Sequence, residues 1–162
     1  MTPSFELPVF CVWTENFRQL HERWRQSLPA GLTPVDLQLP VPGTEFGFLS
    51  AHMQLCVRLK QQLLRAYLGT QPDGKLVAVS DCDIRFIKPD ATVWWTLTEY
   101  FLGDPDLEFL FVRERELEQV NVGFYVTRNS VKVRDFLDQS DVACRERWPQ
   151  LEQTYFNHHL AT

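Results

Sequence analysis

Short apolar segments alternate with longer helical patterns along the chain. Five apolar runs, each bounded by polar or turn-forming residues, predict β-strands. They cover residues 7–13, 35–39, 76–79, 107–112 and 120–127. Apolar residues at helical spacing predict helices between these runs. The helices cover residues 16–27, 51–68, 92–102 and 131–139, and a last one begins at Pro149.

Residues that favour helix ends support several of these boundaries. We expect Thr14 to cap the first helix, Ser50 to cap the second, and Asn129 or Ser130 to cap the fourth. Gly69 is expected to end the second helix. The order strand, helix, strand at the start of the chain favours a parallel pair joined by a crossover. The sequence therefore predicts an α/β fold with a mostly parallel central sheet flanked by helices.

The helix predicted over residues 51–68 has two distinct faces. Its polar face is expected in water and carries Gln54, Arg58, Gln61, Gln62 and Arg65. Two polar residues, His52 and Lys60, project instead from the apolar face. Lys60 has two interpretations: its aliphatic part covers apolar surface while its amine reaches water, or its amine points over the sheet edge at an anion.

Two acids follow the third predicted strand, and they are the most informative feature of the sequence. The apolar run 76–79 leads directly to Asp81 and Asp83. Asp is a poor strand former, and a buried charge is costly unless it has a partner. A divalent cation with oxygen ligands would be a suitable partner. In open α/β sheets, ligands bind beyond the carboxyl ends of the strands, so these acids are candidate site residues.

Composition limits the classes of function that remain. The 162 residues suit one domain over 1–162. The net charge of −5, without a long basic run, argues against nucleic-acid binding. Four cysteines without C-x-x-C spacing are expected to be reduced thiols. No segment approaches the roughly 20 apolar residues of a membrane span, and the first residues do not resemble a signal peptide. We therefore expect a cytoplasmic protein, and its tryptophan content is compatible with a homodimer.

Three motifs in order resemble a known family. Residues 77–89, with Asp81-Cys82-Asp83, look like the Asp-x-Asp strand of GT-A glycosyltransferases, closest to the nucleotide-diphospho-sugar transferase group. Residues 121–126 are similar to its Asn-x-Gly-Phe strand, and Glu152-Gln153-x-x-x-Asn157 to its Asp-Gln-x-x-x-Asn helix. The helix with Lys60 resembles the one that precedes the acidic strand. The chain differs in having Glu152 where the family usually has Asp, and it is short for this fold.

The resemblance implies a fold, an activity and residue roles. The expected fold is a small GT-A, Rossmann-like three-layer sandwich that binds a UDP- or GDP-sugar and transfers the sugar to an unknown acceptor. The implied roles are as follows: Asp83 ligates Mn²⁺ or Mg²⁺; Asp81 contacts the metal or the ribose; Lys60 lies near the diphosphate; Asn121 and Gly123 line the sugar and acceptor side; and Glu152 and Gln153 contact the donor sugar. Thr14, after the first strand, is also a candidate for substrate binding.

Each of these residues also has a structural interpretation. Asn121 caps a strand end, Gly123 allows close packing, and Glu152 favours a helix N-terminus. His158 and His159 are more readily explained as helix residues than as metal ligands, and Trp94 and Trp95 as core or interface residues. Two other functions stay open: a catalytically silent sugar- or nucleotide-binding protein, and a phosphohydrolase with Asp81 as nucleophile and Asp83 as acid/base.

Overall fold

The structure is a computed structural model that describes residues 6–41, 50–87, 91–114, 119–146 and 152–160. The side chains of residues 91–95 and 113–114 are not described, so the interpretation of Trp94 and Trp95 stays untested. The elements in chain order are β1 (Leu7–Trp13), the 3-10 helix η1 (Glu15–Phe17), α1 (Arg18–Ser27), β2 (Leu32–Gln38), α2 (Ala51–Gly69), β3 (Leu76–Ser80), α3 (Ala91–Gly103), β4 (Phe109–Glu114), β5 (Gln119–Arg128), α4 (Val131–Glu146) and α5 (Glu152–Leu160).

A single five-stranded sheet forms the middle layer, with strand order β2-β1-β3-β5-β4. β1 pairs in parallel with β2 and with β3, whereas β5 is antiparallel to both β3 and β4. Four strands therefore run in one direction and β5 runs in the other, which confirms the predicted mostly parallel sheet. Pro34 lies on the edge strand β2, where a missing backbone donor is tolerated.

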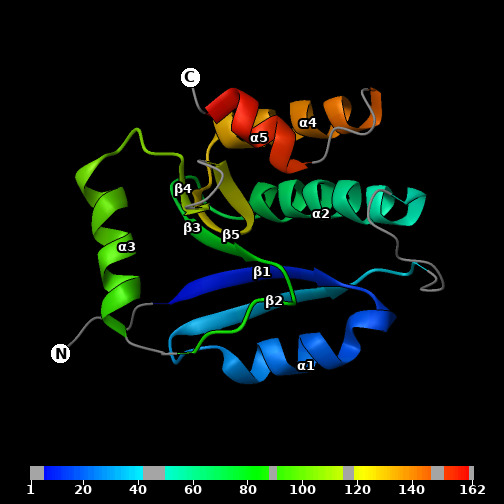
Figure 1. The fold of residues 1–162 in the computed structure, drawn as a ribbon. Coiled ribbons are helices and arrows are strands. Elements are labelled where there is room, and N and C mark those ends of the chain that lie inside the picture. Colours follow the sequence, from blue (N-terminus) through cyan, green and yellow to red (C-terminus); the bar gives the residue numbers. More distant parts are fainter. Residues whose placement is uncertain (1–5, 42–49, 88–90, 115–118, 147–151, 161–162) are drawn as a thin grey trace.

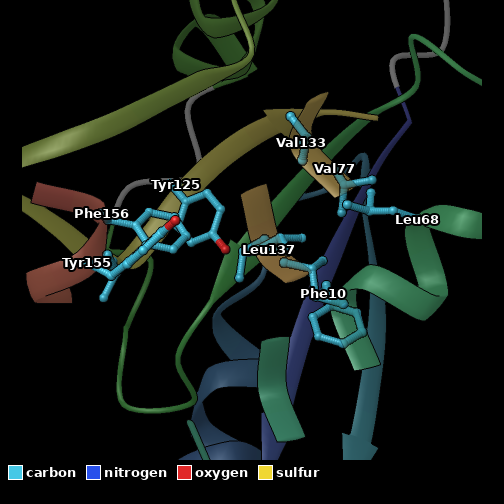
Figure 2. Packing of buried hydrophobic residues seen from close by; sticks show 11 residues of the cluster. Phe10, Leu68, Val77, Tyr125, Val133, Leu137, Tyr155 and Phe156 are labelled. Atoms are coloured by element: carbon cyan, nitrogen blue, oxygen red, sulfur yellow. The ribbon is translucent and has the colours of Figure 1, made fainter. Parts of the chain in front are cut away.

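Helices cover both faces of the sheet (Figure 1). Alternate residues of a strand point to opposite faces, so Val9 and Ala78 pack with Trp24 of α1 and Phe101 of α3. On the other face, residues of α2, α4 and α5 pack on the strands. Figure 2 shows this larger cluster, in which the labelled residues are Phe10, Leu68, Val77, Tyr125, Val133, Leu137, Tyr155 and Phe156. The predicted three-layer arrangement is confirmed.

The capping predictions have mixed outcomes. Ser50 caps α2, because its side-chain oxygen accepts a hydrogen bond from Met53 N at 3.2 Å. Ser130 caps α4 in the same way through Val133 N, at 3.1 Å. The prediction for Thr14 is wrong: its side chain makes no capping hydrogen bond, and its buried Oγ1 has no partner among the described residues. A 3-10 turn, closed by a bond from Phe17 N to the Thr14 carbonyl at 2.9 Å, begins this helix instead.

The prediction that the polar face of α2 lies in water is right for Gln62, which is exposed, but wrong for the face as a whole. α4 covers this face, and Gln61 is buried. Arg58 and Gln62 both donate to Asp141 of α4, at 3.0 Å each. Arg65 donates to Asp138 one turn earlier on α4, at 3.1 Å. A pattern of polar residues identifies a face that is not apolar, but another charged helix can cover such a face as well as water can.

Most predicted boundaries agree with the structure within a few residues. β1 has the predicted bounds, while β2 begins three residues earlier than predicted and β4 two residues later. α4 continues to Glu146, beyond the predicted end at residue 139. Pro149 and most of the predicted charged connector, residues 115–118, lie outside the described residues. Within the described part of the chain, no helix is both long enough and apolar enough to cross a membrane.

Candidate functional site

A cleft of about 870 Å³ opens at the carboxyl ends of β1 and β3. It is lined by the residues that the sequence singled out: Thr14, Lys60, Asp81, Asp83, Asn121, Gly123, Glu152 and Gln153. These residues come from five different segments of the chain. The structure thus brings every predicted site residue into one cavity.

The reversed direction of β5 explains how two of the motifs meet. Parallel strands end at the same edge of a sheet, whereas an antiparallel neighbour begins there. Ser80, the last residue of β3, is paired with Phe124, so Asn121 and Gly123 lie beside the residues that follow β3. A bond from Asp81 N to the Gly123 carbonyl, 2.7 Å long, joins the two motifs directly.

Asn157 attaches the third motif to this edge. Its Oδ1 accepts a hydrogen bond from Val120 N at 2.7 Å, and its Nδ2 donates to the Val120 carbonyl at 3.2 Å. Nδ2 also donates to the carbonyl of Gln153, one turn earlier on α5, at 2.8 Å. These bonds hold α5 against the start of β5, and Glu152 and Gln153 therefore lie at the cleft.

Lys60 lies at the centre of the site. Its side chain is 8% exposed, and its Nζ donates to Asp81 Oδ1 at 2.9 Å and to Glu152 Oε2 at 3.3 Å. The Val122 carbonyl, 3.4 Å from Nζ, is a third acceptor. Lys60 therefore points at anions over the sheet edge, as in the second of its two interpretations, but these anions are carboxylates of the chain itself.

Burial and charge act in opposite directions on this network. Burial alone would lower the pKa of Lys60, but the neighbouring charges of Asp81 and Glu152 outweigh it and hold this pKa well above its ordinary value. Burial raises the pKa of Glu152, against the attraction of Lys60, and the charge of Asp81 raises it further. Glu152 Oε1 is buried without a hydrogen-bond partner among the described residues. The ammonium is thus shared between one buried carboxylate and one accessible carboxylate.

The expectation that Asp81 and Asp83 are buried charges is wrong. The Asp81 side chain is 42% exposed, and Asp83 is exposed as well. The buried carboxylate of the site is instead Glu152, whose side chain is 5% exposed. The partner of Asp81 in the structure is the ammonium of Lys60, and that contact uses one of its two carboxylate oxygens.

Gly123 is required by the close approach of two side chains. A Cβ at this position would lie 2.8 Å from Asn121 Oδ1 and 3.3 Å from Asp81 Oδ2. The Asn121 oxygen is held there by a hydrogen bond from Gly123 N, at 2.7 Å. Glycine therefore leaves room for both polar side chains at the cleft, which agrees with the interpretation that it allows close packing.

The rest of the cleft wall was missed by sequence reasoning. It is largely apolar and includes Val12, Trp13, Phe17, Leu39, Met53, Val57, Ile84 and Val122. Trp13 stacks on His21 of α1 with ring centroids 4.4 Å apart and planes 8° apart. His21 in turn contacts Asp36 Oδ2 through Nε2, at 2.6 Å. The position of Trp13 at the end of a buried strand was the available signal, because ligands bind at such ends.

The cysteines and the two C-terminal histidines are also candidate ligands by residue type, and neither histidine lies at the cleft. All four cysteines are free. Cys82, between the two acids, lines the cleft, and burial together with the charges of Asp81 and Asp83 raises its pKa to about 12. His158 and His159 are exposed on α5 and do not line the cleft. Within the described residues, no three or more His, Cys, Asp or Glu side chains converge on one point where they could hold a metal ion together.

Comparison with solved structures identifies the fold. A glycosyltransferase involved in the glycosylation of the major capsid of PBCV-1 matches with a TM-score of 0.61 and 12% identity, over 97% of this chain and 77% of that one. The glycosyltransferase GlyE of Streptococcus pneumoniae TIGR4 matches with TM-scores of 0.58 in its apo form and 0.56 in a second structure, each at 15% identity and over 94% of this chain. The chain spans only 42% and 43% of those two structures.

These likenesses confirm a fold that glycosyltransferases also have. No protein-family model and no curated protein sequence matches the chain. The GT-A family assignment and the metal role of the Asp-x-Asp motif therefore stay predictions.

Proposed function

We propose that this chain transfers a sugar from a nucleotide-diphosphate sugar to an acceptor with the help of a divalent cation. The observation that carries the proposal is the meeting of three separate motifs in one cleft. Asp81 and Asp83, Asn121 and Gly123, and Gln153 line a single cavity. The solved structures that share the fold are described as glycosyltransferases.

The charge of the cleft supports a role for a cation. Among the described lining residues there are three carboxylates, from Asp81, Asp83 and Glu152, and one ammonium, from Lys60. An anionic diphosphate would enter a cavity that is already negative. Because desolvated like charges repel strongly, the diphosphate needs a counter-cation to bind.

The donor groups suit Mg²⁺ or Mn²⁺. Hard cations prefer oxygen ligands, and Mg²⁺ is commonly held by one or two carboxylates together with substrate phosphates. Asp81 and Asp83 are both accessible and would hold the ion. When bound, such an ion stabilises the negative charge that develops on a phosphate leaving group.

The reaction needs binding and orientation from the protein. The bond between the anomeric carbon and the diphosphate oxygen breaks, and its electron pair leaves with the nucleoside diphosphate. An acceptor hydroxyl forms the new bond, and its proton passes to a phosphate oxygen of the leaving diphosphate or to water. In this proposal Asn121 and Gln153 contact the sugar. Glu152 acts through Lys60, because its Oε1 is buried and its Oε2 contacts the ammonium.

A thermal-shift experiment tests the proposal. The chain is heated with Mn²⁺ alone, with UDP or GDP alone, and with both together. A ligand at about 100 times its Kd stabilises a protein by roughly 2.7 kcal/mol, which corresponds to about 5–10 °C at this size. We expect such a shift for one nucleotide only when Mn²⁺ is present, and its loss in D83N.

Two outcomes would contradict the proposal. If no nucleotide or nucleotide sugar changes the melting temperature, the result would indicate that the chain binds neither kind of ligand. Release of phosphate from small phosphoesters, without a nucleotide-dependent shift, would favour the phosphohydrolase.

A further inference from the structure

The ammonium of Lys60 pairs with Asp81, a carboxylate that a metal ion would also bind. This ammonium lies 2.9 Å from Asp81 Oδ1, and the Lys60 side chain is almost fully buried on α2. A divalent ion bound to the same carboxylate would lie within a few ångströms of this positive charge. A doubly charged ion and an ammonium at such a distance repel each other strongly. The ammonium and the ion therefore compete for Asp81.

The other contacts of Lys60 indicate how its hydrogen bonding changes if Asp81 binds a metal ion instead. An ammonium has three N–H donors, and the structure provides three acceptors: Asp81 Oδ1, Glu152 Oε2 and the Val122 carbonyl. Two of these remain if Asp81 turns to a metal. One donor is then left unpaired at a buried position, which is unfavourable. An anionic oxygen of a ligand in the cleft would replace the lost acceptor.

We propose that Lys60 is a built-in counter-cation of Asp81, which a divalent ion displaces readily only when an anionic ligand arrives to accept the freed ammonium. This inference rests on the proposed metal-dependent function and adds a rule for binding. Metal and diphosphate each strengthen the binding of the other, because coupling between two ligands is reciprocal. Lys60 thus keeps the cleft from holding metal tightly in the absence of substrate.

The decisive experiment frees Asp81 without changing the charge of the cleft. The double variant K60M/E152Q removes one positive and one negative charge from the buried pair, so the net charge of the lining residues stays the same. Neutral groups also avoid the unpaired buried carboxylate that K60M alone would leave. Mn²⁺ binding without nucleotide is measured by calorimetry or by the spin-resonance signal of free Mn²⁺.

We expect K60M/E152Q to bind Mn²⁺ alone on the order of tenfold more tightly than the wild-type chain, within the usual range of coupling between sites. E152Q alone, which retains Lys60, is the control and is expected to show no tightening. K60Q/E152Q is a second neutral pair for the same comparison, should the methionine variant fail to fold.

Failure of this inference differs from failure of the proposed function. If neither neutral pair binds Mn²⁺ more tightly than wild type, while UDP or GDP still stabilises wild type with Mn²⁺, the counter-cation role is refuted and the proposed function stands. If no variant binds Mn²⁺ and no nucleotide stabilises the wild type, both are refuted.

Discussion

A single buried lysine determines how the residues of the cleft interact. Lys60 joins Asp81, which is accessible to ligands, to Glu152, which is not. A buried ion pair contributes little net stability, but the loss of one partner is costly. The pair is therefore better explained by what it does to Asp81 than by its contribution to the free energy of unfolding.

Gly123 gives a residue-scale prediction. G123A introduces a Cβ within 2.8 Å of Asn121 Oδ1, so the Asn121 side chain must move and its bond to Gly123 N is strained. We expect the free energy of unfolding to fall by about 1–3 kcal/mol, as for other overpacked sites. The stabilisation by nucleotide and Mn²⁺ should be lost. Thermal unfolding with and without ligand measures both effects.

The matched control is Gly103, where a Cβ would meet nothing within 4 Å. G103A should keep the full response to ligand. An unchanged ligand response in G123A would show that the close approach at the cleft does not matter for binding.

Cys82 gives a second residue-scale prediction, which concerns reactivity. Its pKa is raised from about 9 to about 12, first by burial and then by the charges of Asp81 and Asp83. The thiolate is the reactive form, but a more basic thiolate is also a better nucleophile, so at pH 8 alkylation should be slower than in the unfolded chain by a factor on the order of ten to a hundred. The rate should rise about tenfold per pH unit until the pH approaches 12.

Mass spectrometry of iodoacetamide-treated protein, folded and in denaturant, measures the rate at Cys82 directly. Equal rates in the two states at pH 8 would contradict the raised pKa.

At the scale of elements, the direction of β5 and the attachment of α5 bring the motifs together. β5 is antiparallel to β3, so its first residues lie beside the acids that follow β3. α5 is held to the start of β5 through the two bonds between Asn157 and Val120. The position of Gln153 at the cleft depends on this attachment.

Asn157 gives the prediction at this scale. N157A removes both bonds to Val120, so the N–H and the carbonyl of Val120 lose these partners. We expect a loss of about 2–3 kcal/mol in the free energy of unfolding, since each such bond contributes about 1 kcal/mol and an unpaired group adds its own cost. The Val120 amide should also exchange its hydrogen faster, as measured by hydrogen exchange in NMR.

N157D separates the two bonds, because its carboxylate still accepts from Val120 N but donates nothing to the Val120 carbonyl. Its second oxygen would also lie against the carbonyls of Val120 and Gln153, so its loss of stability should be at least as large as that of N157A, while the Val120 amide should exchange more slowly than in N157A. If N157A exchanges at Val120 as slowly as wild type, α5 is not attached in this way.

The elements show which features a sequence can predict. The bounds of β1 and the Ser50 cap follow from local patterns that involve neighbouring residues only. The burial of Gln61 does not, because it depends on α4, where its partner Cys144 lies 83 residues further along the chain. Threonine is a residue type that often caps helices, but a 3-10 turn begins after Thr14 and its side chain makes no capping hydrogen bond.

The candidate site was also only partly predictable, because local motifs can be recognised in a sequence and contacts between distant residues cannot. Its motifs could be recognised one by one, and the structure brings their residues to one cavity. The partner of Asp81 could not be predicted, since Lys60 is 21 residues away and its two interpretations differ only in three dimensions. The apolar wall was missed because its residues have the pattern of an ordinary core.

At the scale of the whole molecule, the fold and the charge of the cleft are both compatible with the proposed transfer of a sugar. The sheet, with helices on both faces, matches that of glycosyltransferases at TM-scores of 0.56–0.61. The cleft lies where ligands bind in open α/β sheets. In the proposed function, the cleft's excess of carboxylates is the reason that a metal ion accompanies the anionic substrate.

The most direct measurement is a crystal structure of the chain grown with Mn²⁺ and the nucleotide, UDP or GDP, that stabilises it. Anomalous scattering locates manganese independently of the protein. The account predicts a peak bonded to oxygens of Asp81 or Asp83 and to the diphosphate, with Lys60 turned from Asp81 toward a phosphate oxygen. Nucleotide bound outside this cleft, or manganese away from both acids, would contradict it.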